Sequence, residues 1–400
     1  MLKNIKYIND DPGSGILYNW KLIFKTCKQL KLFPDDDTIW NPSKVPLYDT
    51  KWNVLMSIRA KGKTTNVLLL GLVMYQLYGT VTVYLGQNKD SIRPKNAAGV
   101  YNVIRSFDYI ERITEGRFND IVLQSGGKWF LRRVDEDGNV LDKDNKPCCI
   151  NLAISEWSDY KSKVNYPTAD LVVYDEFIGK FYYPNEFLDM CDVLSTLFRH
   201  RISPVIFMLS NTINKYHQYF NELDIFDVVQ GLQAGQSVIH EAINGARVYV
   251  SIIDPKVNEK KKFFNRLFFG FKNPGLGAIT GGTLWSEFNY PHCINSEDQE
   301  PIFRNAYIYY NRKYVNLELV RNEMGIVINA HWSKHIYDDS IVYTLEPHYD
   351  KRYRYKLGDP SKSHIDKIIH DIIKSNKLYY STNDVGSFVT SYFNACKLTK

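Results

Sequence analysis

Two apolar runs, residues 52–57 and 63–78, are joined by a short polar loop. The first run predicts a buried strand, and the second, which is apolar on nearly every side, predicts a helix inside a core. The loop carries Gly62 and Lys63 at the end of the pattern GxxxxGK[ST], with Ser57 in the place of the first glycine. Because backbone N–H groups converge on anions where a helix begins, this context favours a phosphate-binding loop over a basic surface turn.

The side chains of such a loop have separate tasks. The lysine of the pattern, here Lys63, places its charge beside the β- and γ-phosphate oxygens, and the hydroxyl that follows, on Thr64, ligates Mg²⁺. We therefore expect ATP and Mg²⁺ as ligands. The residues that we predict to line the ATP are Ser57, Ile58, Arg59, Ala60, Lys61, Gly62, Lys63, Thr64 and Thr65.

Polar side chains also follow two later strands. The apolar segment ADLVVYDEF, residues 169–177, predicts a buried strand that ends in two carboxylates. Asp175 is suited to hold the Mg²⁺, and Glu176 to orient and polarise the attacking water. The next predicted strand, residues 204–211, ends in Asn211, whose amide is placed to sense the γ-phosphate.

Strands without polar alternation are separated by helices, which is typical of a parallel sheet covered on both faces. The three strand ends describe an α/β P-loop ATPase of the ASCE type, in which the loop strand and the carboxylate strand flank the sensor strand. We predict that residues 1–254 form this motor domain. Residues 255–290 combine a basic run with Pro and several Gly, as linkers do. Residues 291–400 are strand-rich and predict a small α+β domain.

Composition limits the alternatives. The chain of 400 residues is 44% hydrophobic and has a net charge of +6, which suits a partner with phosphates without requiring one. The longest apolar stretch, residues 67–77, is too short to span a bilayer, and the start lacks a signal-type segment. We therefore expect a soluble protein with no membrane partner. Six cysteines without metal-ligand spacing indicate reduced thiols in a cytoplasm.

The same segments carry a family resemblance. SxRxxGKT, residues 57–64, resembles the Arg-containing phosphate loop of viral DNA-packaging ATPases, the terminase large subunits. YKSKVNYPTADLVVYDEFIGKFYYPNEF, with LSTLFRHR and FMLSNT, resembles more closely the packaging ATPase of small, protein-primed, short-tailed bacteriophages. The resemblance covers about residues 50–220. It implies a homomeric, pentameric ring at the portal vertex of an empty capsid in the host cytoplasm, which drives double-stranded DNA inward with ATP. It leaves open whether a packaging RNA is a further partner.

The resemblance also implies residues that act across a subunit boundary. In this family an arginine of the neighbouring subunit completes each site and stabilises charge on the transferred phosphoryl group. Arg199 in TLFRHR matches it best, with Arg201 as the alternative, and Lys161 in YKSK matches a lysine that also acts in trans. A pore that accepts any DNA sequence must contact the backbone. The candidates in the inserted strands are Lys128, Arg132 and Arg133.

Large terminase subunits end in an RNase H-like nuclease, whose clustered carboxylates hold two metal ions. Here the strand NAYIYYNRKYVNLEL has tyrosines and asparagine where the first aspartate should fall, so we expect a vestigial nuclease domain that binds and does not cut. The basic segment YDKRYRYK, residues 349–356, is a candidate contact for phosphates, RNA or the portal. Two alternatives stay open: an active terminase that cleaves DNA, and a P-loop helicase. The carboxylates that do not restore the nuclease pattern are Asp338, Asp339, Glu346 and Asp384.

Overall fold

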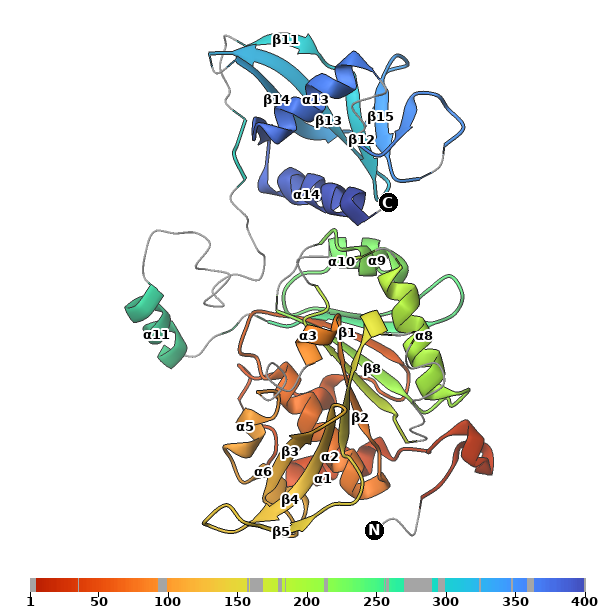
Figure 1. Cartoon of the computed structure of the whole chain (residues 1–400), viewed down its shortest axis with the longest axis vertical. Helices are drawn as coiled ribbons and strands as arrows, with labels where there is room; N and C mark the ends of the chain where they lie inside the picture. Colours follow the sequence, from red (N-terminus) through yellow and green to blue (C-terminus); the bar gives the residue numbers. More distant parts are fainter. Residues whose placement is uncertain are drawn as a thin grey trace.

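The structure is a computed structural model of the chain, and it contains two β-sheets with helices packed on them (Figure 1). It describes residues 5–398 except 35, 93–98, 157, 159–167, 179–181, 184, 212–214, 255, 257–258, 270–289, 294–298, 324, 347 and 358–362. The larger sheet belongs to the N-terminal lobe and the smaller one to the C-terminal lobe.

The elements of the N-terminal lobe alternate between strands and helices along most of the chain. Its strands are β1 (Trp52–Met56), β2 (Thr82–Gly86), β3 (Asp120–Gln124), β4 (Lys128–Val134), β5 (Val140–Lys143), β6 (Cys149–Ala153), β7 (Leu171–Asp175), β8 (Val205–Ser210), β9 (Ser237–Glu241) and β10 (Arg247–Ile252). Its α-helices are α1 (Trp20–Gln29), α2 (Lys63–Tyr78), α3 (Lys89–Ile92), α5 (Asn102–Arg105), α6 (Tyr109–Ile113), α8 (Glu186–Phe198), α9 (Gln218–Glu222) and α10 (Phe226–Gly231). Short 3₁₀ helices are η2 (Ile8–Asp10), η3 (Pro12–Ser14), η4 (Pro42–Lys44) and η5 (Ile154–Glu156).

The larger sheet has ten strands in the order β3-β4-β6-β2-β7-β8-β1-β10-β9, with β5 paired to β4. The strands from β6 to β10 in this order run parallel, and antiparallel strands flank them on both sides. β8 lies between β1 and β7, which confirms the predicted order of an ASCE-type P-loop sheet. Both faces are covered, because alternate residues of β1 enter different cores: Val54 and Met56 one, Leu55 the other.

Helix α2 lies tightly against the sheet. It is buried on most sides, as its apolar sequence predicts. A Cβ added at Gly71 would lie 2.2 Å from Oγ1 of Thr82 in β2 and 3.1 Å from Cδ2 of Leu171 in β7. The absence of a side chain at Gly71 therefore allows this close approach between helix and sheet.

A buried polar cluster stands at the amino ends of the central strands, opposite the phosphate loop. Asp170, just before β7, accepts hydrogen bonds from Nε of Arg201 (2.9 Å), from the hydroxyl of Ser203 (2.5 Å) and from Tyr18 (3.0 Å). The Arg201 and Asp170 side chains are only 7% and 1% exposed. Buried charges need such partners, so this ion pair fixes the N-terminal segment and the start of β8 to the sheet.

The smaller sheet follows the order β16-β15-β12-β13-β14-β17, with β11 paired to β13. β12, β13 and β14 are antiparallel, and β15 and then β16 continue parallel to β12. An RNase H-like fold for this lobe, which the family resemblance implies, stays a prediction. Its elements are β11 (Glu300–Phe303), β12 (Ala306–Tyr310), β13 (Lys313–Asn322), β14 (Gly325–Ser333), β15 (Ile341–Thr344), β16 (Tyr353–Tyr355), α13 (His364–Lys374), β17 (Leu378–Tyr380) and α14 (Asn383–Leu398).

Along the chain, helix α11 (Glu259–Phe269) comes between the two sheets, and in Figure 1 it stands to one side of the N-terminal lobe. The larger sheet ends with β10 at Ile252, and the smaller one begins with β11 at Glu300. A division into a motor domain (1–254), a linker (255–290) and a C-terminal domain (291–400) is our proposal for these boundaries.

Candidate functional site

The predicted site residues from β1, β7 and β8 meet at the carboxyl edge of the larger sheet. These three strands are neighbours and run parallel, so the loops that follow them leave from the same edge. In open α/β sheets, ligands bind at this edge. The phosphate loop follows β1, Asp175 ends β7, and Asn211 follows β8.

The loop after β1, the predicted phosphate-binding loop, contains two residues in the left-handed conformation. Gly62, the residue before α2, has φ of 72°, and a Cβ there would lie 3.1 Å from Cγ2 of Ile39. Ala60 also takes a left-handed conformation, with φ of 62°. Ser57, in place of the first glycine, is fully buried, and its N–H donates to the carbonyl of Ser210 in β8 over 3.1 Å. The loop is therefore tied to the sensor strand at its first residue.

Lys63 lies at the centre of the site and is only 4% exposed. Its ammonium group donates to the Oγ of Ser57 and, over 2.9 Å, to the Oδ1 of Asn211. Burial lowers the pKa of Lys63 to about 8, although the nearby carboxylates of Asp175 and Glu176 act in the opposite direction. Oxygens of the protein itself thus accept hydrogen bonds from the lysine.

Thr64 and Asp175 form the pair expected of a magnesium site. The hydroxyl of Thr64 donates to Oδ2 of Asp175 over 2.9 Å, and the hydroxyl of Tyr84 reaches the same oxygen over 3.5 Å. Burial raises the pKa of Asp175 above its ordinary value, while the hydrogen bond from Thr64 and the charge of Lys63 oppose that rise. A hydroxyl and a carboxylate are oxygen ligands of the kind Mg²⁺ prefers, so these residues fit the ion.

Glu176 stands one residue beyond the strand and adopts φ of 53°. A left-handed conformation is unfavourable for a residue with a side chain, and such positions concentrate at functional sites. The Nδ2 of Asn211 donates to Oε1 of Glu176 over 3.2 Å, while the Oδ1 of the same amide accepts from Lys63. Asn211 therefore links the lysine and the glutamate across the site.

The remaining loop residues divide into buried and exposed. Lys61 is 2% exposed and donates to the carbonyls of Thr38 (2.9 Å) and Lys256, so its charge serves the loop and its neighbours. Ile58 is buried, whereas Arg59 and Ala60 are exposed and Thr65 is half-buried.

The predicted trans-acting residues lie elsewhere. Arg199 caps the C-terminus of α8 with φ of 44° and is exposed at the amino edge of the sheet, away from its own phosphate loop. Arg201 is held by Asp170 and Ala169 in the buried cluster described above. Lys161 lies outside the described residues.

The candidate DNA-contacting residues lie on β4, in the antiparallel flank of the sheet. Arg132 forms an ion pair with Asp120 at 2.7 Å, and Arg133 donates to the carbonyl of Gly116. Lys128 is half-buried and Arg133 is exposed. In the C-terminal basic segment, Arg352 pairs with Asp350 at 2.6 Å. The arginines among these are thus already engaged within the chain.

Three of the C-terminal carboxylates have partners within the chain. Asp339 accepts from Asn305 over 2.7 Å, Asp338 lies 3.5 Å from Arg352, and Asp384 accepts from Tyr216 of the N-terminal lobe over 2.8 Å. Within the part of the chain that the structure describes, no group of three or more His, Cys, Asp or Glu side chains is arranged to hold a metal ion. The described helices include none long and apolar enough to cross a membrane.

Sequence reasoning missed a buried carboxylate beside the site. Glu186, the first residue of α8, is fully buried and accepts from Gln87 (2.6 Å), Tyr174 (3.0 Å) and Tyr219 (2.8 Å). Burial raises its pKa, and these hydrogen bonds oppose that rise. The sequence offers no signal for it, because Gln87 and Tyr219 are 132 positions apart and meet only in the fold.

No protein-family model matches the chain. Over 191 residues it is 24% identical to the proteins named "DNA packaging protein" of Bacillus phages PZA and phi29, a match that covers 46% of this chain and 50% of each relative. The chain is homologous to these phage proteins. It spans about half the length of the relatives that it matches. The resemblance inferred from the motifs is confirmed. Because the match covers only half of each relative, the activity and partners of this chain are proposals.

Two solved structures have a similar fold. One is described as the Phi-28 gp11 DNA packaging motor, with a TM-score of 0.52, 18% identity and coverage of 91% of this chain and all of that one. The other is the bacteriophage Phi-29 genome packaging motor assembly, with a TM-score of 0.55, 18% identity and coverage of 89% and 98%. At this identity the likeness concerns the fold, and it extends over both lobes of the chain.

Proposed function

We propose that this chain is an ATP-hydrolysing motor that moves double-stranded viral DNA into a preformed capsid. One observation carries the proposal. At the carboxyl edge of the larger sheet, hydrogen bonds join the predicted site residues, which are Lys63, Thr64, Asp175, Glu176 and Asn211. The chain that carries them is homologous to phage DNA packaging proteins.

The protein's own groups divide the work of hydrolysis. ATP phosphates replace Ser57 and Asn211 as partners of Lys63, whose charge then faces the β- and γ-phosphates. Glu176 accepts a hydrogen bond from the attacking water and orients it in line with the γ-phosphate. Asn211, released from Lys63, senses that phosphate and keeps its bond to Glu176.

Thr64 and Asp175 would hold Mg²⁺, which supplies positive charge against the phosphate oxygens. Thr64 would hold the ion through its hydroxyl, and Asp175 would hold it through a water molecule. Their present hydrogen bond holds both groups on the same side of the loop. The hydroxyl of Tyr84 steadies the carboxylate from β2.

We propose a ring, pentameric as in the resembled family, in which Arg199 completes the site of the neighbouring subunit. Arg199 is exposed and lies away from its own phosphate loop, so it can serve a nucleotide only across a subunit boundary. Arg201 is the weaker candidate, because leaving Asp170 would strand a buried carboxylate. Lys161 belongs to the same proposal, on the resemblance alone.

For the C-terminal lobe we propose binding without cleavage, with the portal, DNA or a packaging RNA as partner. The sequence supports this, because tyrosines and asparagine stand where the first nuclease aspartate should fall. The setting is the host cytoplasm, at the portal vertex of the capsid.

The test is steady-state ATP hydrolysis by the purified full-length chain, titrated with linear double-stranded DNA and read beside a gel of that DNA. DNA-stimulated hydrolysis with intact, unseparated DNA supports a packaging motor. Cleaved DNA would indicate an active terminase, and separated strands a helicase. Lys63→Ala is the control: because it removes the charge that faces the phosphates, hydrolysis above background in this variant would refute the site assignment.

A further inference from the structure

The hairpin between β12 and β13 carries an unusual tip. Asn311 and Arg312 both have positive φ, 48° and 57°, which gives the two-residue connection its tight reversal. The residues on either side, Tyr310 and Lys313, pair across the hairpin. The tip therefore presents four consecutive side chains at one end of the C-terminal sheet.

Each of these four side chains contacts the segment that follows β8 in the N-terminal lobe. Tyr310 donates to Oε1 of Gln218 over 3.1 Å, and Nδ2 of Asn221 donates to Oδ1 of Asn311 over 2.8 Å. Arg312 lies 3.9 Å from Asp227, but both are more than 80% exposed, so this pair contributes little. The partners belong to α9 and α10.

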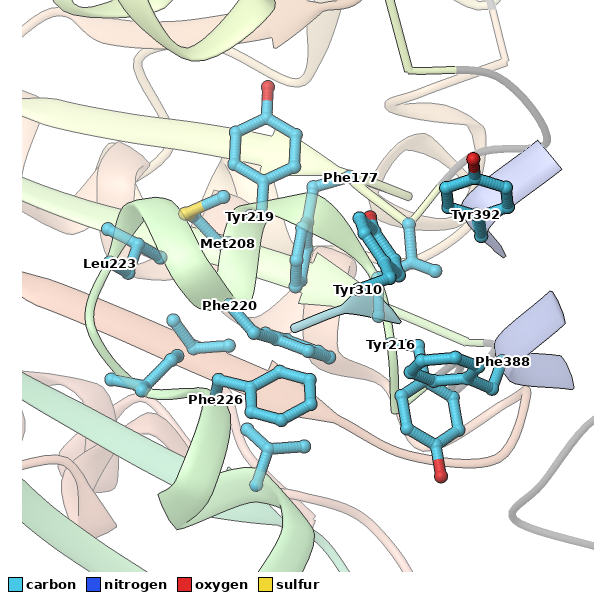
Figure 2. Packing of buried hydrophobic residues seen from close by; sticks show 14 of the residues in the cluster. Phe177, Met208, Tyr216, Tyr219, Phe220, Leu223, Phe226, Tyr310, Phe388 and Tyr392 are labelled. Atoms are coloured by element: carbon cyan, nitrogen blue, oxygen red, sulfur yellow. The ribbon is translucent and has the colours of Figure 1, made fainter. Parts of the chain in front are cut away.

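Lys313 makes the most extensive contact. Its ammonium group lies 5.5 Å from the ring centroid of Tyr216 and 5.8 Å from that of Phe226, both in the N-terminal lobe, and 5.4 Å from that of Trp332 in β14. Such distances permit cation–π attraction to all three rings. Tyr216 also packs edge-on against Phe388 of α14. Figure 2 shows Tyr216 and Phe226 near Tyr310 and Phe388 in one buried cluster.

The docked segment is joined to the nucleotide site in two ways. Along the chain, Tyr216 is five residues beyond Asn211. Through space, Tyr219 of α9 donates to the buried Glu186, which also accepts from Tyr174, the residue before Asp175. One carboxylate thus holds α9 to the end of the strand that carries the predicted magnesium and water-orienting groups.

We propose that the β12–β13 hairpin is a positioning element of the ATP site, anchored by Lys313. By holding α9 and α10 it fixes the segment that carries Asn211, and through Asn211 the orientation of Glu176 towards the attacking water. The inference rests on the proposed ATPase function and deepens it. Lys313 touches no nucleotide, so its loss acts on the chemical step and leaves ATP binding intact.

The test is Lys313→Met in the full-length chain, with ATP hydrolysis measured over a range of ATP concentrations in the presence of linear double-stranded DNA. We expect kcat to fall about 5- to 10-fold, while KM stays within about twofold of wild type. Lys313→Arg keeps the charge over the rings and should restore most of kcat. Asn221→Ala, on the other side of the contact, should lower kcat in the same direction. The matched control is Lys334→Met, which removes an exposed lysine of the same lobe and should change nothing.

Hydrogen exchange of residues 215–231 separates the outcomes. In Lys313→Met these amides should exchange faster than in wild type, with the rest of the N-terminal sheet unchanged. Faster exchange with wild-type kcat would overturn the positioning role. Unchanged exchange with unchanged kcat would overturn the docking as well. A wild-type chain that neither binds nor hydrolyses ATP would refute the proposed function itself, and the positioning role with it.

Discussion

If Lys63 binds the phosphates of ATP, as we propose, its burial should make the affinity for ATP depend on pH. Burial lowers the pKa of Lys63 to about 8. Triphosphate oxygens favour the charged ammonium group, so binding above that pH requires uptake of a proton. With a pKa of about 8, the protonated fraction falls from about nine-tenths at pH 7 to about one-tenth at pH 9, and the Kd for ATP should rise about tenfold.

The assay is titration of a fluorescent ATP analogue, with Mg²⁺, at pH values from 7 to 9. The triphosphate is fully ionised in this range, and Tyr84 stays neutral because burial raises its pKa above the ordinary value of 10. Lys63→Arg is the matched control: an arginine keeps its proton, so its Kd, whatever the absolute value, should be flat across the range. A flat Kd in wild type would refute the reasoning.

The same lowered pKa of Lys63 should also make the stability of the fold depend on pH. The unfolded chain keeps the proton of Lys63 up to about pH 10.5, whereas the folded chain releases it from about pH 8. The unfolded state therefore binds more protons between these values, and the contribution of Lys63 to the free energy of unfolding should increase as the pH rises through this window.

Three further predictions concern other residues. Glu176→Gln should bind ATP but hydrolyse it at least ~10²-fold more slowly, because an amide cannot accept the proton of the attacking water; hydrolysis near the wild-type rate would exclude Glu176 as the base. If Arg199 acts in trans, mixing inactive Arg199→Ala with inactive Glu176→Gln should recover some ATPase activity; no recovery in rings shown to be mixed would count against it. Burial lowers the pKa of His217 to about 3, so the folded chain keeps this histidine neutral while the unfolded chain protonates it below about pH 6.5. The free energy of unfolding, measured with urea, should therefore fall by ~2 kcal/mol between about pH 6.5 and pH 5. His217→Asn can still cap α9 and should lose this acid sensitivity; an unchanged pH dependence would assign the loss to other groups.

The elements that surround the nucleotide site are the ones that sequence predicts well. The predicted helix 63–78 coincides with α2, and the strand predictions around β1, β7 and β8 differ from the structure only at their ends. Each has a strong local signal: an apolar run bounded by a glycine loop or by carboxylates.

What sequence could not supply are contacts between distant segments. The sequence around Arg201 does not indicate its ion pair with Asp170, because no local pattern distinguishes a buried arginine from an exposed one. Arg132 likewise meets Asp120 only because β3 and β4 pair in that register. The hairpin tip at Asn311 and Arg312 could be expected to turn, but nothing local indicates which surface it meets.

The close contact at Gly71 bears on which elements around the proposed nucleotide site can move. Because α2 touches β2 and β7 at Gly71, we expect little movement of the helix if phosphates bind at its first turn, as we propose. Movement would then be expected in the loops after β7 and β8, and the segment after β8 contacts the C-terminal lobe. Gly71→Ala would push α2, which begins with Lys63, away from β2 and β7. The helix could then move instead of the loops.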